Sequence, residues 1–230
     1  MKFLAIYKKE LREALPWILA AIAIFGFIVT MVIMSQRSHW FYSDNWGKMA
    51  DSPVRAYQFI KYSPANSCGP LFFFTSIGLG LALGVRQFWM PKFSKTWAFT
   101  LHRSIRREGI FFAKLASSVT AFILGLGIPW TLYYEYLTRP DIVPIPLSFR
   151  ILLEGWAFVL IGILIYSGTA VSGLSRGRWF GTKMFYLIFA IIVMIIAFIS
   201  QGLLGFTITI VIGLAVLLVQ LFNMFMSKEF

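Results

Sequence analysis

Long uncharged stretches alternate with short polar segments along the chain, and this pattern predicts helices that cross a membrane. A run of about 20 apolar residues is long enough to span the hydrocarbon core of a bilayer as a helix. We place four such spans at about 15–34, 66–88, 111–134 and 152–174. Pro129, near the outer end of the third span, is expected to kink it.

The remaining apolar sequence is a single run of 44 residues, 184–227, without a charged side chain. As one helix it would extend about 66 Å, twice the thickness of the hydrocarbon core, so it must cross twice. The turn signal Ser200-Gln201-Gly202 predicts a fifth span at about 184–200 and a sixth at about 205–226. A re-entrant dip at 200–206 is the alternative.

The composition agrees with this pattern. The chain has 230 residues, of which 59% are hydrophobic and only 13% are charged. A soluble domain is about 25% charged, and so few charges do not cover the surface of so apolar a globule. We therefore predict an all-α polytopic membrane protein with six transmembrane helices in a single transmembrane domain, 1–230.

Two polar segments are predicted to form helices outside the spans. Residues 1–14 place apolar side chains at helical spacing and basic side chains on the other faces, which is typical of an amphipathic helix lying in the membrane interface. Its candidate interface residues are Tyr7, Leu11 and Arg12. The alternative is a basic flank that only orients the first span. The outer loop 35–65 is predicted to contain a short interfacial helix at about 53–62.

The formal net charge of +12 is explained by the orientation of the spans. If both termini are cytoplasmic, 15 basic residues lie on the cytoplasmic side and 6 on the outer side. Lys and Arg collect in cytoplasmic loops, so this bias predicts cytoplasmic termini. We expect a multi-pass protein of the inner (cytoplasmic) cell membrane, with the lipid bilayer as a partner and no nucleic acid.

Catalytic chemistry is scarce in the sequence. No P-loop motif occurs, and Cys68, His39 and His102 are too few for a multi-ligand metal site. The ionisable residues near the spans are Arg86, Lys114, Glu135 and Glu154. All four lie near predicted span ends, which weakens the case for ion-coupled transport. We expect no catalytic residue, no metal and no cofactor in this chain. A membrane-embedded enzyme that depends on His39, His102, Glu135 or Glu154 is the alternative.

Small residues recur every four positions on two predicted spans. They are Ala113, Ser117, Ala121 and Gly125 on the third span, and Gly80 and Gly84 on the second. Such stripes let helices approach closely in lipid. They indicate packing within one subunit, with a dimer seam as the alternative.

The most distinctive polar segment is the basic connection 89–109 between the second and third spans. Over residues 92–114, the spacing of Thr96, Leu101, Arg107 and Lys114 resembles the first cytoplasmic loop of the type-2 ABC transporter permeases. These permeases are the membrane subunits of ATP-driven exporters. The start of the chain, with Lys8-Lys9-Glu10-Leu11-Arg12-Glu13, also resembles the N-terminal connecting helix of that family.

The resemblance implies a permease subunit of an ABC exporter, which works with a second permease subunit as a homo- or heterodimer. Two copies of a cytosolic ABC ATPase would bind ATP and Mg, so this chain would not be an enzyme itself. An ATPase-independent membrane scaffold or assembly protein is the alternative function.

The residues of this connection also favour docking on a soluble partner. Phe93, Trp97, Thr100 and Leu101 share one face of a helix, and such a face can insert into a groove with charges at its rim. The candidate ATPase-coupling residues are Phe93, Thr96, Trp97, Thr100, Leu101, Arg103, Arg107 and Lys114. The alternative is a helix held on the membrane surface by anionic lipid.

Overall fold

The computed structural model describes residues 2–40, 64–94, 106–139, 148–175, 180–200 and 202–227. Within these ranges every regular element is a helix. In chain order the elements are α1 (Lys2–Trp40), α4 (Pro64–Gly84), η1 (Val85–Trp89), α5 (Met90–Phe93), α7 (Arg107–Phe122), η2 (Ile123–Gly127), α8 (Ile128–Leu137), α9 (Phe149–Leu174), α10 (Phe180–Ile199) and α11 (Gly202–Met226). The predicted interfacial helix at 53–62 lies outside the described residues.

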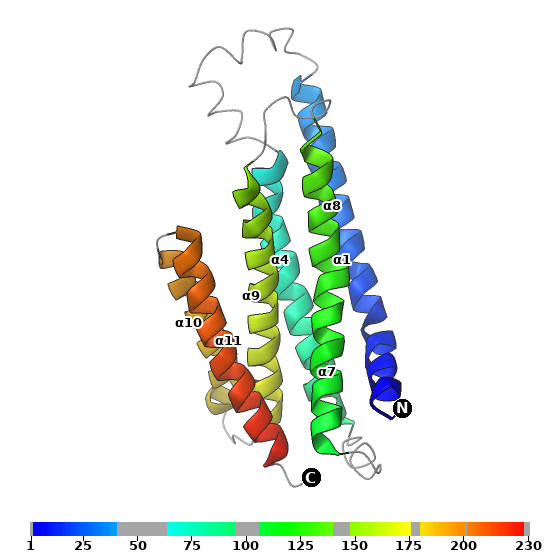
Figure 1. The fold of residues 1–230 in the computed structure, drawn as a ribbon, viewed down its shortest axis with the longest axis vertical. Coiled ribbons are helices and arrows are strands. Elements are labelled where there is room, and N and C mark those ends of the chain that lie inside the picture. The colour runs from blue at the N-terminus through cyan, green and yellow to red at the C-terminus, as the bar shows by residue number, and fades with distance from the viewer. Residues whose placement is uncertain are drawn as a thin grey trace.

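Six helical rods are long and apolar enough to cross a membrane, which confirms the six predicted spans and makes the chain a multi-pass membrane protein. The second rod joins α4, η1 and α5, and the third joins α7, η2 and α8. Figure 1 shows the rods side by side. The start of α1 and the end of α11 lie at one end of the bundle, which we call the terminal end.

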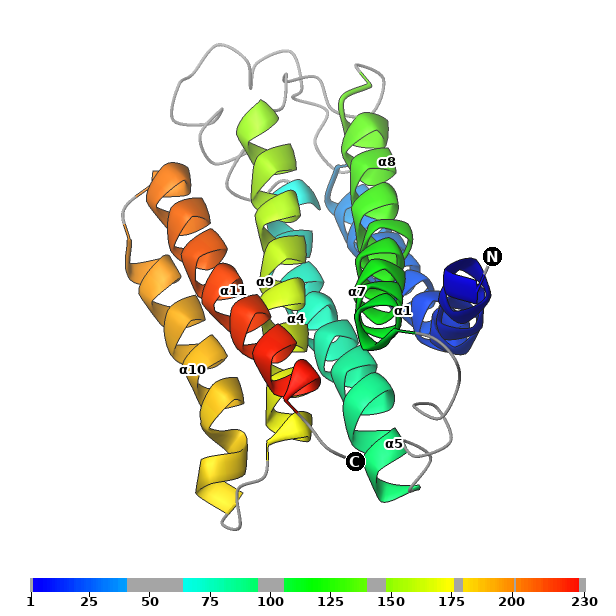
Figure 2. The same ribbon diagram turned by 60° about the horizontal axis from the view of Figure 1, so that its bottom comes forward.

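Helix α9 forms the centre of the bundle. It packs against α4 on one side and against α10 and α11 on the other (Figure 2). Its second half, from Leu164 to Ser175, is buried throughout. Helix α1 packs against α4 and α7 at the far side of the bundle from α10.

The stripes of small residues face the inside of this bundle. Ser117, Ala121 and Gly125 are buried, and Gly80 lies directly against the backbone of α9 at Gly162. This confirms that the stripes pack within one subunit. They are not exposed for a dimer seam.

The third rod is distorted next to Pro129, as expected, and the distortion is a π-helical turn. Proline lacks a backbone N–H, and its ring crowds the carbonyl group four residues earlier. That carbonyl belongs to Gly125, which lies within η2. The wider π-helical turn relieves this crowding without ending the helix.

Helix α1 differs from the separate interfacial helix predicted for residues 1–14. It continues without interruption past Pro16 for 39 residues, or about 58 Å. Ile6, Glu10 and Ala14 are buried at four-residue spacing, and the buried stripe continues into the span. This stripe therefore packs on protein, whereas the apolar side chains of Phe3 and Leu4 are exposed.

The 44-residue run crosses twice, as predicted, through α10 and α11. Gly202 begins α11 with a φ of 89°, a left-handed conformation that glycine adopts without a steric penalty. Because residues 202–206 are helical, a simple turn replaces the alternative of a re-entrant dip.

Candidate functional site

Polar side chains from four rods meet inside the bundle, toward the terminal end. We call them the buried polar cluster: Glu10 of α1, Gln87 of η1, Lys114, Ser117 and Ser118 of α7, and Tyr166 of α9. Each is less than one-tenth exposed. Polar groups at this depth must be hydrogen-bonded to one another, because neither water nor lipid replaces a lost partner there.

An ion pair lies at one side of this cluster. The Nζ atom of Lys114 is 2.7 Å from Oε1 of Glu10, and the two side chains are 5% and 9% exposed. Lys114 also donates to the backbone oxygen of Gln87, at 3.3 Å. Its ammonium group lies 5.8 Å from the centre of the Phe88 ring, within reach of a cation–π interaction. The ion pair therefore joins α1, η1 and α7.

The side chain of Gln87 connects the other members of the cluster. Its Nε2 atom donates to Oγ of Ser117 at 3.2 Å. Its Oε1 atom accepts from Oγ of Ser118 at 2.9 Å and from the hydroxyl of Tyr166 at 2.7 Å. One amide thus holds α7 and α9 to the π-helical turn η1. π-Helical turns within α-helices are frequent at functional sites.

Tyr166→Phe is expected to destabilise the chain by about 1 kcal/mol, because it removes one hydrogen bond to Gln87 while Ser118 still satisfies the same oxygen. Tyr136→Phe, which changes an exposed tyrosine on α8, is the matched control and should leave stability unchanged. Thermal unfolding of the detergent-solubilised chain measures both. Equal stability of the two variants would contradict the hydrogen bond from Tyr166.

Lys114 lies near one end of the third rod, but the sequence did not predict its burial. Lys114 lies two turns inside α7 and is fully enclosed by protein. The sequence analysis did not single out Glu10 as a site residue. Its burial could have been suspected from its spacing, because Glu10 lies midway between Ile6 and Ala14 on the buried stripe of α1.

The predicted interface residues divide between protein and solvent. The Tyr7 hydroxyl lies 3.0 Å from Oγ1 of Thr120, and Leu11 packs against the core. Arg12 is exposed. Two of the three side chains therefore hold α1 to the bundle.

The structure describes three of the predicted ATPase-coupling residues and separates one from the others. Phe93 is 74% exposed at the end of α5, and Arg107 begins α7, where it donates to the backbone oxygen of Met226 at 3.4 Å. Lys114 belongs to the buried polar cluster and is not available at the surface. The others, Thr96, Trp97, Thr100, Leu101 and Arg103, lie outside the described residues.

The end of α5 is fixed to the end of α9. Lys92 donates from Nζ to the backbone oxygens of Gly173 and Ser175, at 3.1 and 3.0 Å. These carbonyls end a helix, where a cation satisfies them and interacts favourably with the helix dipole. One turn earlier, Nε1 of Trp89 donates to the oxygen of Thr169 at 2.9 Å.

A looser ion pair links α1 to the second rod nearby. Arg86 lies 3.4 Å from Glu13, and both side chains are more than one-third exposed. Pairs this exposed contribute about 0–1 kcal/mol to stability. The Arg86–Glu13 pair connects α1 to the second rod, and the buried Lys114–Glu10 pair connects α1 to the third rod.

No metal-binding constellation accompanies these polar residues in the described part of the chain, where no three His, Cys, Asp or Glu side chains gather. Of the residues considered for an embedded enzyme, Glu135 is exposed and Glu154 pairs with Arg150. The buried polar cluster can hold helices in a defined arrangement.

Comparison of the chain with protein-family models, with curated proteins and with solved structures finds no match.

Proposed function

We propose that this chain is the membrane-spanning permease subunit of an ATP-driven ABC exporter, coupled to a separate cytosolic ATPase. The observation that carries the proposal is that the described residues on both sides of the segment 95–105 are attached to other rods. Lys92 binds the end of α9, and Lys114, two turns into α7, is ion-paired to α1. The resemblance of residues 92–114 to the coupling loop of type-2 permeases gives this segment its expected partner.

The contacts suggest how movement of this segment would reach the spans. A push on α5 would act on the end of α9 through Lys92 and Trp89. A push on the start of α7 would act on α1 through the ion pair of Lys114 with Glu10. ATP-driven closure of two ATPase subunits would in this way displace the first four rods together. Two permease subunits would then open a path between them.

In this proposal the chain lies in the inner membrane of the cell, and the terminal end of the bundle faces the cytosol. The bias of 15 to 6 basic residues supports it. Phe93, exposed at the terminal end, would then face the ATPase.

The test is retention of a P-loop ATPase when the full chain is purified from its own cells in mild detergent. Phe93→Glu and Leu101→Glu are each expected to lower the retained ATPase by about tenfold, as loss of a central apolar contact does at protein interfaces. Phe149→Glu is the matched control. Phe149 is also an exposed phenylalanine, but it begins α9 at the opposite end of the bundle, and its variant should retain the ATPase.

Two results together would contradict the proposal: the intact chain retains no ATPase, and Leu101→Glu leaves the transport activity of the cells unchanged. That outcome would favour the ATPase-independent scaffold, which predicts no ATP-dependent transport in vesicles reconstituted with candidate partners.

A further inference from the structure

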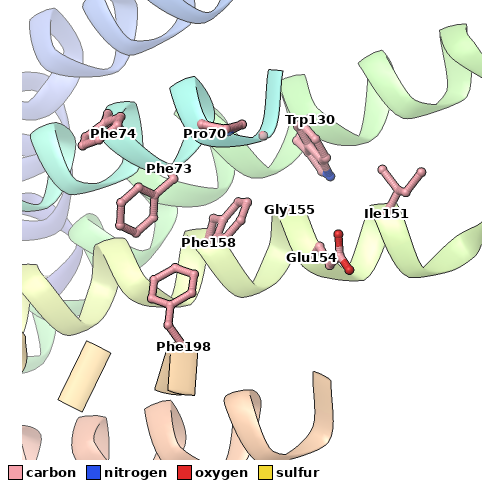
Figure 3. Close-up of a pocket in the computed structure, with 10 residues that line it drawn as sticks. Pro70, Phe73, Phe74, Trp130, Ile151, Glu154, Gly155, Phe158 and Phe198 are labelled. Carbon is pink, nitrogen blue, oxygen red and sulfur yellow. The ribbon is translucent and has the colours of Figure 1, made fainter. Parts of the chain in front are cut away.

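A cavity lies between α4, α8, α9 and α10 near the end of the bundle opposite the terminal end (Figure 3). Its volume is about 410 Å³, within the range of about 300–1,000 Å³ typical of pockets for small molecules. Aromatic side chains make up much of its wall. Glu154 is the one ionisable side chain among the described residues that line it. The pocket is thus apolar with a single negative group.

The aromatic rings and the carboxylate occupy different parts of the cavity. In Figure 3, Phe73, Phe158 and Phe198 gather at one end, while Trp130 and Glu154 lie at the other. The Phe73 ring meets the rings of Phe158 and Phe198 edge to face, with centroids 5.7 and 5.5 Å away. An occupant would therefore meet ring surfaces at one end and a carboxylate at the other.

Close packing of α8 against α9 places Trp130 at this cavity. Its indole lies against α9 at Gly155, where a Cβ atom would overlap the ring. Its Nε1 atom donates to the backbone oxygen of Leu152 at 3.3 Å. The indole is also stacked on the Phe72 ring, with centroids 4.7 Å apart, and is only 2% exposed. It therefore closes the wall of the cavity at the end where Glu154 lies.

Glu154 has a partner that a ligand can compete with. Nε of Arg150 donates to its Oε1 atom at 2.9 Å, one helical turn away. The Arg150 side chain is 68% exposed and the Glu154 side chain 39%, so this pair is weak. A cation inside the cavity can therefore displace Arg150 from this carboxylate.

We propose that this cavity binds a lipophilic organic cation: a quaternary ammonium, a phosphonium or a protonated amine that carries an apolar body. The charge lies at Glu154, and the body packs against the phenylalanine rings. Charge complementarity selects this occupant, because Glu154 is the one ionisable side chain among the described residues that line the cavity and its ion pair with Arg150 is weak. The site goes beyond the proposed export function and needs no ATPase, so the two proposals fail separately.

The test uses the full chain in nanodiscs of zwitterionic lipid and two probes of the same shape and opposite charge, tetraphenylphosphonium and tetraphenylborate. Equilibrium dialysis measures saturable binding above that of empty nanodiscs. We expect saturable binding of the phosphonium, and Glu154→Gln should weaken it by about tenfold or more. Glu154→Asp, which keeps the charge, should retain most of the affinity. Glu135→Gln, which removes an exposed carboxylate outside the cavity, is the matched control and should bind normally.

Phe158→Ala tests the aromatic contribution to binding separately from the charge. We expect this variant to bind the phosphonium more weakly than the wild type does, but still more strongly than it binds the borate. Thermal unfolding confirms that each variant is folded before it is measured. Phosphonium affinity that is the same for wild type and folded Glu154→Gln would overturn the proposal. So would saturable borate binding of equal strength, since it would identify an apolar occupant such as a lipid chain.

Discussion

Lys114→Met is expected to destabilise the folded chain by about 3–5 kcal/mol, because it leaves the Glu10 carboxylate buried without its partner. Methionine has a similar length and an apolar stem, so it fills the space of the lysine side chain without introducing a clash. What disappears is the 2.7 Å contact with Glu10 and the donor to the backbone of Gln87. Thermal or denaturant unfolding in detergent measures the loss.

Lys9→Met is the matched control for this prediction. Lys9 lies on the same helix as Glu10 and forms an ion pair with Glu13 at 3.7 Å, but its side chain is 58% exposed. Exposed pairs at this spacing contribute about 0.3–0.5 kcal/mol, so this variant should unfold almost like the wild type. Equal stability of Lys9→Met and Lys114→Met would contradict the burial of the Glu10–Lys114 pair.

The double variant Glu10→Leu/Lys114→Met separates the cost of an unpaired charge from the value of the pair. Because neither charge remains, we expect it to recover most of the stability lost in Lys114→Met. A buried ion pair is therefore weak evidence for stability on its own. Its particular effect here is to fix α1 against α7 through a directional contact, which apolar side chains would not specify as narrowly.

The hydrophobic pattern predicted the six spans well, because the thickness of a bilayer sets the length of a transmembrane helix. The run 152–174 became α9 (Phe149–Leu174), and 205–226 became α11 (Gly202–Met226). The same pattern did not predict which helices pack together. A predominantly apolar helix such as α9 carries little periodicity that distinguishes its protein neighbours from lipid.

The buried polar cluster could be predicted only in part. The motif at 92–114 indicated Lys114 as a candidate residue. Its partner Glu10 is 104 positions away in the chain, so no local pattern links the two. The uninterrupted joining of residues 1–14 to the first span was missed for a related reason. An amphipathic face looks the same in sequence whether it covers lipid or protein, and only the packing of α1 on α7 decides between the two.

The close approach of α4 to α9 leads to the second prediction. Gly80→Ala is expected to destabilise the chain by about 3 kcal/mol, at the upper end of the usual cost of overpacking. A Cβ atom at this position would overlap the backbone oxygen of Gly162 and lie 3.2 Å from the backbone nitrogen of Tyr166. Side chains can turn away from an added methyl group, but these atoms belong to the backbone of α9. The two rods must therefore separate.

Separation of these rods would also loosen the cluster, because Tyr166 reaches Gln87 across the same interface. Gly78→Ala is the control on the same helix, since a Cβ atom there would meet nothing within 4 Å. It should be neutral or slightly stabilising, because alanine favours a helix by up to about 1 kcal/mol over glycine. Thermal unfolding of both variants in one detergent gives the comparison. If Gly80→Ala is as stable as Gly78→Ala, α4 and α9 do not approach this closely, and the small-residue stripe has no packing role.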